Sequence, residues 1–142
     1  MIRPFKHRCS PIRLGEFDLG GVLYHARYFH LYEEAREAFL IANHLPYSQF
    51  IAQGQHLAIV ESHQSFSGPV RYGDELEIDL WFSELKRSSL KVCYSLSIAP
   101  APTAPIHTAW TRHALVQSGA NGFRPTKIGD PLESLVRRFL ID

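Results

Sequence analysis

The sequence of 142 residues has little of what marks several classes of protein. Its two cysteines, Cys9 and Cys93, are too few for a disulfide framework, and neither belongs to a CxxC pair. The formal net charge is only +1, which argues against a dedicated nucleic-acid surface, because such domains carry a strong basic excess. No apolar run approaches the roughly 18–20 residues of a membrane span, and no apolar stretch of a secretory signal follows the basic N-terminal residues. We therefore expect a cytoplasmic protein without a transmembrane segment.

What the sequence does contain is the composition of a folded protein, with 45% hydrophobic residues and 20% charged residues. We find no internal repeat and no low-complexity tract. A single core commonly holds about 100–200 residues, so the length predicts one domain over residues 1–142.

The segment 28–45 has the apolar spacing of an amphipathic helix. Its glutamates and His30 fall on the face opposite the apolar one. Asn43 and His44 precede Leu45-Pro46, and the residue before a proline is pushed out of the helical region, which predicts the end of the helix here. The apolar face consists of Tyr28, Leu31, Tyr32, Ala35, Ala38, Phe39 and Ala42.

After this helix the period of the apolar pattern changes to two, which is typical of strands with one buried face. The stretches 74–82 and 90–98 alternate regularly, 57–66 and 106–117 alternate less regularly, and a first strand within 5–14 is interrupted by Pro11. Turns are predicted at 71–75, 86–89, 99–105 and 118–122, and Asp130-Pro131 opens a short C-terminal helix with aspartate as N-cap and proline at the first helical position. Short turns make sequential strands antiparallel neighbours. The pattern predicts an α+β fold, an antiparallel sheet of about five strands wrapped around one long helix.

The stretch 18–28, DLGGVLYHARY, places a carboxylate and a histidine directly before the predicted helix. Taken alone, Asp18 is either a turn residue or an acid positioned for chemistry. His25 is likewise either a surface residue or part of a site. Glycines at 20 and 21 allow a tight turn, and the N–H groups at a helix start lack helical partners, so they can hold a developing negative charge.

This stretch resembles the D-x-x-G-V-V-Y-H-A-N-Y signature of the hotdog-fold acyl-CoA thioesterases. The similarity is to the 4-hydroxybenzoyl-CoA thioesterase-like group, near the bacterial acyl-CoA thioesterases associated with the Tol-Pal system. It continues through the EAR of residues 34–36, the GPVRYGD of residues 68–74 and the late Arg124-Pro125. The sequence departs from the pattern at Arg27, where asparagine is common.

The resemblance implies a hotdog fold and the hydrolysis of an acyl- or aroyl-CoA thioester to free acid and coenzyme A, without a metal or redox cofactor. It implies that Asp18 is the catalytic carboxylate, with His25 as the second catalytic candidate. Asp18 then either attacks the thioester and forms a mixed anhydride or activates a water molecule, and the sequence leaves both roles open. Main-chain N–H groups near Gly21, Tyr24 and His25 are the implied oxyanion donors.

The basic turn of residues 86–89 has two interpretations, a solvated hairpin end or a clamp on phosphate groups. The resemblance implies the second, with Lys86, Arg87 and Ser89 binding coenzyme A. Two histidine pairs, His25 with His30 and His107 with His113, lack a metal-ligand spacing such as HExxH, so no metal site is expected.

The resemblance further implies a homodimer or homotetramer whose site lies between two subunits, with Asp18 of one subunit facing residues 59–63 of the other. The expected substrate is an acyl-CoA, with an acyl carrier protein thioester as the alternative. Three other functions stay open: a hotdog-fold dehydratase, a hydrolase dedicated to an aromatic or carrier-protein-bound intermediate, and a non-catalytic acyl-thioester binding protein.

Overall fold

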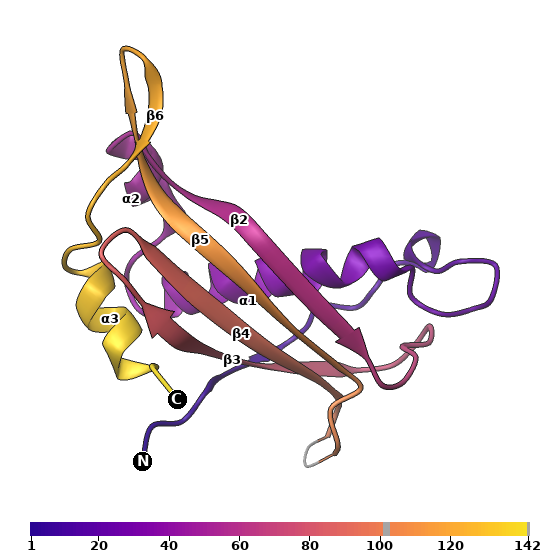
Figure 1. The fold of residues 1–142 in the computed structure, drawn as a ribbon. Coiled ribbons are helices and arrows are strands. Elements are labelled where there is room, and N and C mark those ends of the chain that lie inside the picture. Colours follow the sequence, from indigo (N-terminus) through magenta and orange to yellow (C-terminus); the bar gives the residue numbers. More distant parts are fainter. Residues whose placement is uncertain (101–102, 142) are drawn as a thin grey trace.

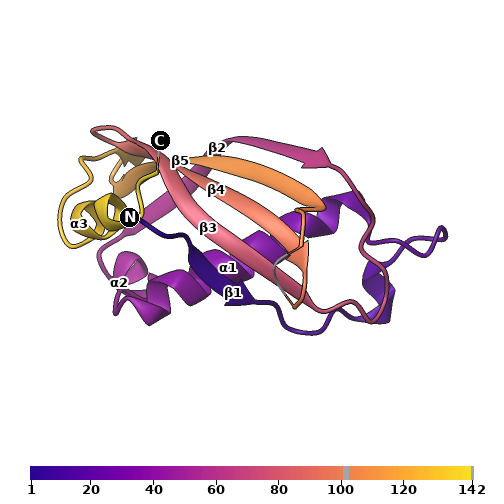
Figure 2. The ribbon, with the colours of Figure 1, turned by 90° about the horizontal axis from the view of Figure 1, so that it is seen from below.

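The computed structural model describes residues 1–100 and 103–141, so positions 101 and 102 of the predicted turn at 99–105 lie outside the described residues. One long helix, α1, lies along one face of a curved antiparallel sheet (Figures 1 and 2). The helices are α1 (Tyr28–Ala42), α2 (Tyr47–Ala52) and α3 (Leu132–Arg138). The strands are β1 (Phe5–Arg8), β2 (Gln55–Phe66), β3 (Leu76–Leu85), β4 (Ser89–Ile98), β5 (His107–Gly119) and β6 (Gly122–Pro125). Within the described ranges no helix is both long and apolar enough to cross a membrane.

The sheet has the order β1-β3-β4-β5-β2, and β6 pairs with β5. The predicted arrangement of an antiparallel sheet wrapped on a long helix is confirmed, with six strands rather than about five. Strands β3, β4 and β5 bury every second side chain against α1, as the period of two predicts. The helix and the strand that were not predicted, α2 and β6, span six and four residues, which is too short for a periodic signal.

Helix α1 buries five residues against the sheet and ends at the predicted stop of Asn43-His44, before the apolar spacing itself ends. The last helical residue is Ala42. The Asn43 side-chain amide donates to the Phe39 carbonyl at 2.7 Å, and His44 adopts a left-handed backbone with φ of 61°. The Asn43 backbone N–H also donates to that carbonyl, at 3.2 Å, so the side chain adds a second bond at the helix end, and the left-handed residue turns the chain away. The buried residues of α1 are Tyr28, Tyr32, Ala35, Phe39 and Leu40.

The C-terminal helix α3 begins at Leu132, one residue later than predicted, with Pro131 as the preceding cap residue. Asp130 still satisfies the helix start, because its carboxylate accepts from the Ser134 backbone N–H at 2.9 Å. After α3 the chain returns to β3, where the Phe82 N–H donates to the Phe139 carbonyl at 2.9 Å. This contact closes the end of the sheet.

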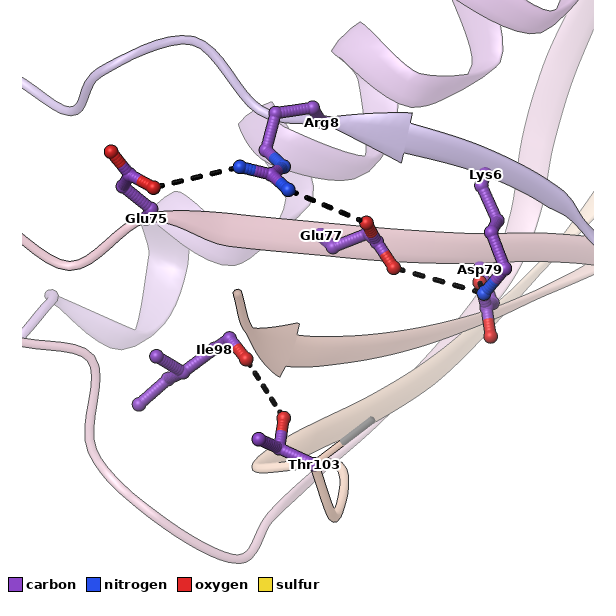
Figure 3. A network of polar contacts seen from close by, with 7 residues as sticks. All are labelled: Lys6, Arg8, Glu75, Glu77, Asp79, Ile98 and Thr103. Atoms are coloured by element: carbon purple, nitrogen blue, oxygen red, sulfur yellow. Dashed lines mark hydrogen bonds and ion pairs between the residues drawn. The ribbon is translucent and has the colours of Figure 1, made fainter. Parts of the chain in front are cut away.

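Charged side chains pair the short strand β1 with β3, as Figure 3 shows. Lys6 contacts Asp79 at 2.9 Å and Glu77 at 3.7 Å, while Arg8 contacts Glu75 at 3.5 Å. In the same view the Thr103 hydroxyl donates to the Ile98 carbonyl at 2.8 Å. Exposed ion pairs contribute only about 0–1 kcal/mol each, so these pairs fix the register of β1 more than they stabilise the fold.

At the opposite edge of the sheet, β2 pairs only with β5 among the described strands. Its residues Ile59 and Val60 are 49% and 57% exposed, and the register with β5 shifts between Ile59 and Glu61. An edge strand with unpaired backbone groups and large apolar side chains is suited to pair with another strand. The fold therefore presents β2 as a surface for association.

Candidate active site

Asp18 lies in the loop before α1, where it forms a tight turn with the residues that follow it. Its N–H donates to the Val22 carbonyl at 2.9 Å, and the Gly21 N–H donates to the Asp18 carbonyl at 3.0 Å. Gly21 has φ of +77°, a conformation that side chains disfavour. The Gly20 N–H donates to the carboxylate Oδ1 at 2.8 Å. The turn thus fixes one carboxylate oxygen, while Oδ2 accepts no hydrogen bond from the residues described, in a side chain that is exposed in the single chain.

A second segment of the predicted signature holds this loop in place. The Leu23 N–H donates to the Val70 carbonyl at 2.9 Å, and Val22 forms an isolated bridge with Arg71. The Arg71 N–H in turn donates to the Asp74 carboxylate at 2.8 Å. The two stretches of sequence that carry the resemblance, 18–28 and 68–74, therefore lie side by side.

The two predicted catalytic residues share one cavity, which we call the Asp18 cavity. It has a volume of about 510 Å³. The His25 ring lies 4.3 Å from the Tyr24 ring, and both side chains are exposed. The Asp18 cavity is lined by Asp18, Val22, Leu23, His25, Tyr28, Phe66, Ser67, Gly68 and Pro69.

The three N–H groups expected as oxyanion donors differ in their availability. The Gly21 N–H is used within the turn, and the Tyr24 N–H donates to the Glu16 carbonyl at 3.1 Å. His25 begins the short 3-10 turn His25–Arg27 that leads into α1, and its N–H donates to no oxygen of the described residues. An amide at such a start has no helical partner. Of the three, the His25 amide is the one available in this structure.

Behind the Asp18 cavity lies a fully buried histidine, His107. Its ring stacks on Tyr28 with 4.0 Å between centroids and meets Phe66 edge-on at 4.8 Å. Its Nε2 lies 3.1 Å from Gln64 Oε1, an acceptor, so Nε2 carries the proton and Nδ1 accepts from the Tyr32 hydroxyl at 2.5 Å. Burial lowers the pKa of His107 to about 4. From the sequence, His107 stands out only as a possible metal ligand together with His113. Its position on the apolar face of a strand indicates a core histidine instead.

The basic turn predicted to bind coenzyme A joins β3 to β4 at one end of the sheet, and the loop before α1 lies toward the other end (Figure 1). Ser89 pairs with Ala114, whereas Phe66 of the Asp18 cavity pairs with His107. Residues 107 and 114 are seven positions apart on β5, which corresponds to roughly 24 Å along an extended strand. The Lys86 and Arg87 side chains are exposed, and Lys86 contacts Glu84 at 3.7 Å. One chain therefore does not bring this turn to its own Asp18.

A second cavity of about 640 Å³, which we call the inner cavity, lies between α1 and the sheet. Buried side chains form its floor, and exposed residues of α1, α2 and β2 form its rim. No pattern in the sequence predicts this cavity, because its lining residues come from seven different elements. The floor includes Phe39, Leu80, Phe82, Leu90, Val92 and Leu132, and the rim includes Glu33, Glu37, Ile51, His56 and Ile59.

Comparison with known proteins identifies the family of this chain. The family model of the thioesterase-like superfamily matches residues 12–134. A 1,4-dihydroxy-2-naphthoyl-CoA hydrolase of Picosynechococcus sp. is 36% identical over 110 residues, which are 74% of this chain and 75% of that protein. A putative esterase of Aquifex aeolicus is 29% identical over 116 residues, 82% of this chain and 88% of that protein.

The fold has a close counterpart among solved structures. The 4-hydroxybenzoyl CoA thioesterase of Pseudomonas sp. strain CBS-3 superposes with a TM-score of 0.82 at 21% identity, covering 94% of this chain and 99% of that one. The predicted hotdog fold and the predicted family are thereby confirmed. The chain belongs to the thioesterase-like superfamily, and it is a thioester hydrolase with the hotdog fold.

Proposed function

We propose that this protein hydrolyses an acyl- or aroyl-CoA thioester, with Asp18 as the catalytic carboxylate. The observation that carries the proposal is the cavity lined by both Asp18 and His25, since among the described residues nothing donates to Asp18 Oδ2 and nothing accepts from the His25 N–H. The names of two similar proteins, a 1,4-dihydroxy-2-naphthoyl-CoA hydrolase and a 4-hydroxybenzoyl CoA thioesterase, support a coenzyme A thioester as the substrate.

The chemistry follows from the two groups. The thioester carbonyl lies between Asp18 and the His25 N–H, which stabilises the negative charge that develops on the carbonyl oxygen. Asp18 either attacks the carbonyl carbon, giving a mixed anhydride that water hydrolyses, or takes a proton from the attacking water. In both routes the carbon–sulfur bond breaks, coenzyme A leaves as a thiolate that takes up a proton, and the acyl group leaves as a carboxylic acid.

A second copy of the chain completes the site in this proposal. Two β2 edges that pair antiparallel about the strand midpoint, between Val60 and Glu61, place Phe66 of one subunit opposite Gln55 of the other. That pairing brings the Asp18 cavity of one subunit to the end of the sheet where the other carries its 86–89 turn. The separation of roughly 24 Å within one chain is then removed, and Lys86, Arg87 and Ser89 bind the coenzyme A held by the partner's Asp18.

Replacing Val60 with lysine tests this association. Val60→Lys places a charge on the exposed edge of β2, so we expect a monomer that has lost thioester hydrolysis. Light scattering after gel filtration gives the mass, and release of the coenzyme A thiol gives the activity. The matched control is Ile41→Lys on α1, because Ile41 and Val60 are both 57% exposed. A Val60→Lys monomer that still turns over at the native rate would refute a site shared between subunits.

The His25→Ala variant separates the histidine ring from its backbone amide. Alanine keeps the N–H proposed to bind the carbonyl oxygen, so we expect kcat for thiol release to fall by only about three- to tenfold, well under the roughly hundredfold of a positioned acid or base. The rate is measured under saturating acyl-CoA beside the native protein. A loss as large as that of an Asp18 variant would instead assign the imidazole to the chemical step.

A further inference from the structure

We propose that the inner cavity is the acyl chamber of the partner subunit's catalytic site, and that it selects acyl or aroyl groups bearing a neutral oxygen function, which Arg36 binds. This inference rests on the proposed thioester hydrolysis and adds the class of substrate. It follows from the form of the inner cavity, its position relative to β2, and the hydrogen bonds in its wall.

The inner cavity suits the body of an apolar ligand. Its floor side chains Leu80, Phe82, Leu90 and Val92 are at most 4% exposed. Its volume of about 640 Å³ falls within the roughly 300–1,000 Å³ of small-molecule sites. The exposed residues that line the cavity include Ile59 of the edge strand β2. An acyl group can therefore enter from the side where a second subunit would sit.

Strand β2 connects the two cavities when two subunits pair. Its first half contributes His56, Leu57 and Ile59 to the inner cavity, while its last residue, Phe66, lines the Asp18 cavity. Pairing about the midpoint sets Phe66 of one subunit beside the first half of β2 of the other, at about 4.7–4.9 Å between strands. A thioester at one Asp18 then directs its acyl group into the inner cavity of the other subunit.

The inner cavity is less suitably placed to receive an acyl group from the Asp18 cavity of its own subunit than from that of the other subunit. His25 of that cavity and Arg36 of the inner cavity are eleven residues apart along the chain that leads into and through α1. At 1.5 Å per residue this corresponds to about 16 Å. The acyl chamber is therefore contributed in trans.

Arg36 is the polar group that gives the inner cavity its selectivity. Arg36 lines the cavity, and among the described residues its guanidinium donates one hydrogen bond, to the Tyr94 hydroxyl at 2.9 Å. None of the carboxylates described lies within 4.0 Å of it. An arginine carries five N–H donors and stays charged, so it has donors left for a ligand oxygen in a mostly apolar chamber.

A chain of buried hydrogen bonds holds the Arg36 side chain in this place. Tyr94 donates to Thr111 Oγ1 at 2.6 Å, and Thr111 donates to His113 Nε2 at 2.8 Å. His113 Nδ1 donates to the Leu57 carbonyl at 3.3 Å, so every member has its partner and the direction of the chain is fixed. The Tyr94 oxygen is thereby an acceptor for Arg36, and the guanidinium is held at the cavity wall.

The rim of the inner cavity indicates which oxygen function fits. The carboxyl side chains of Glu33 and Glu37 line the opening on either side of Arg36 in the sequence. Bringing like charges together costs free energy, so these two glutamates disfavour an acyl group that carries a carboxylate of its own. A hydroxyl or keto group accepts from Arg36 without that repulsion. We therefore expect hydroxylated or keto-substituted acyl groups rather than dicarboxylic ones.

The test compares matched acyl-CoA pairs that differ by one hydroxyl group. The pairs are 2-naphthoyl-CoA with 6-hydroxy-2-naphthoyl-CoA, and decanoyl-CoA with 10-hydroxydecanoyl-CoA. We expect the native kcat/KM to favour the hydroxylated member of at least one pair by about tenfold or more, because an unfilled donor in a buried site is costly. In Arg36→Met this ratio should fall to about one. Arg36→Lys keeps a charge and a donor, so its kcat/KM ratio should lie between those of the native protein and Arg36→Met.

Two further measurements make the outcome decisive. Arg138→Met, at an exposed arginine of α3, is the control that should keep the native ratio, and thermal melting confirms that each variant is folded. Binding of non-hydrolysable ketone analogues of the same pairs is measured by calorimetry. If no thioester is hydrolysed but the preference in binding still depends on Arg36, the proposed hydrolysis fails and the acyl chamber stands. If turnover occurs and Arg36→Met keeps the native ratio, or the native protein shows no preference in either pair, the chamber is refuted.

Discussion

Replacing Asp18 with asparagine is expected to lower the rate of thiol release by at least about two decades, the scale of a positioned acid or base. Asparagine has the same shape, and its side-chain oxygen can still accept from the Gly20 N–H that Oδ1 accepts from in the native turn. The loop before α1 should therefore keep its conformation. The amide is neither a nucleophile nor a base of useful strength, so the loss falls on the chemical step. The measurement is thiol release from acyl-CoA under saturating substrate.

Asp74→Asn is the matched control for that experiment. Asp74 is also a turn aspartate whose carboxylate accepts a backbone N–H, from Arg71 at 2.8 Å, but it does not line the Asp18 cavity. Its asparagine variant should keep a rate within a few-fold of the native one. A folded Asp18→Asn protein with near-native turnover would show that the catalytic carboxylate lies elsewhere.

Acidification from pH 7 to pH 4 should destabilise the fold by several kcal/mol. His107 and His113 are at most 3% exposed, and burial lowers the pKa of each from 6.5 to about 4. Below pH 6.5 the unfolded chain therefore binds protons that the folded chain does not. The stability from the neutral histidines is complete above pH 6.5 and is lost as the pH falls to about 4, on the order of 3 kcal/mol for each residue.

Urea unfolding at a series of pH values measures this dependence. The range between pH 6.5 and pH 5 is the informative one, because most carboxylates stay ionised there. Over this range the unfolding free energy of His107→Gln should fall less steeply than that of the native protein. The control is His30→Gln, at an exposed position of α1, whose unfolding free energy should fall as steeply as the native one. A native stability that is flat from pH 6.5 to pH 4 would contradict neutral, buried histidines.

Local patterns in the sequence predicted the fold where the signal was long and regular. The alternation in β3 and β4 gave both strands within one or two residues at most boundaries, and the apolar stripe of α1 gave its buried face. The apolar spacing runs on to Leu45, but the stop predicted at Asn43-His44 is confirmed, since α1 ends at Ala42 with Asn43 as its cap and His44 in a left-handed conformation. The six residues of α2 are too few to show a period.

The candidate site was predictable only where its residues are close together in the sequence. Asp18 and His25 were placed in one site, and they line one cavity. The contact between Gln64 and His107 behind the Asp18 cavity was not predicted. The two residues are 43 positions apart, and only the pairing of β2 with β5 brings them together. Tyr24 was predicted as an oxyanion donor, but its N–H donates to Glu16, a contact that depends on how the loop folds back.

The most direct test is the structure of the Asp18→Asn variant with an intact acyl-CoA bound. The proposed mechanism requires the side chain at position 18 to lie within about 3–3.5 Å of the thioester carbonyl carbon, with the carbonyl oxygen on the His25 N–H. The acyl group should extend into the inner cavity of the second subunit. A thioester bound with its carbonyl away from both groups, and the residue 18 side chain in solvent, would contradict the mechanism.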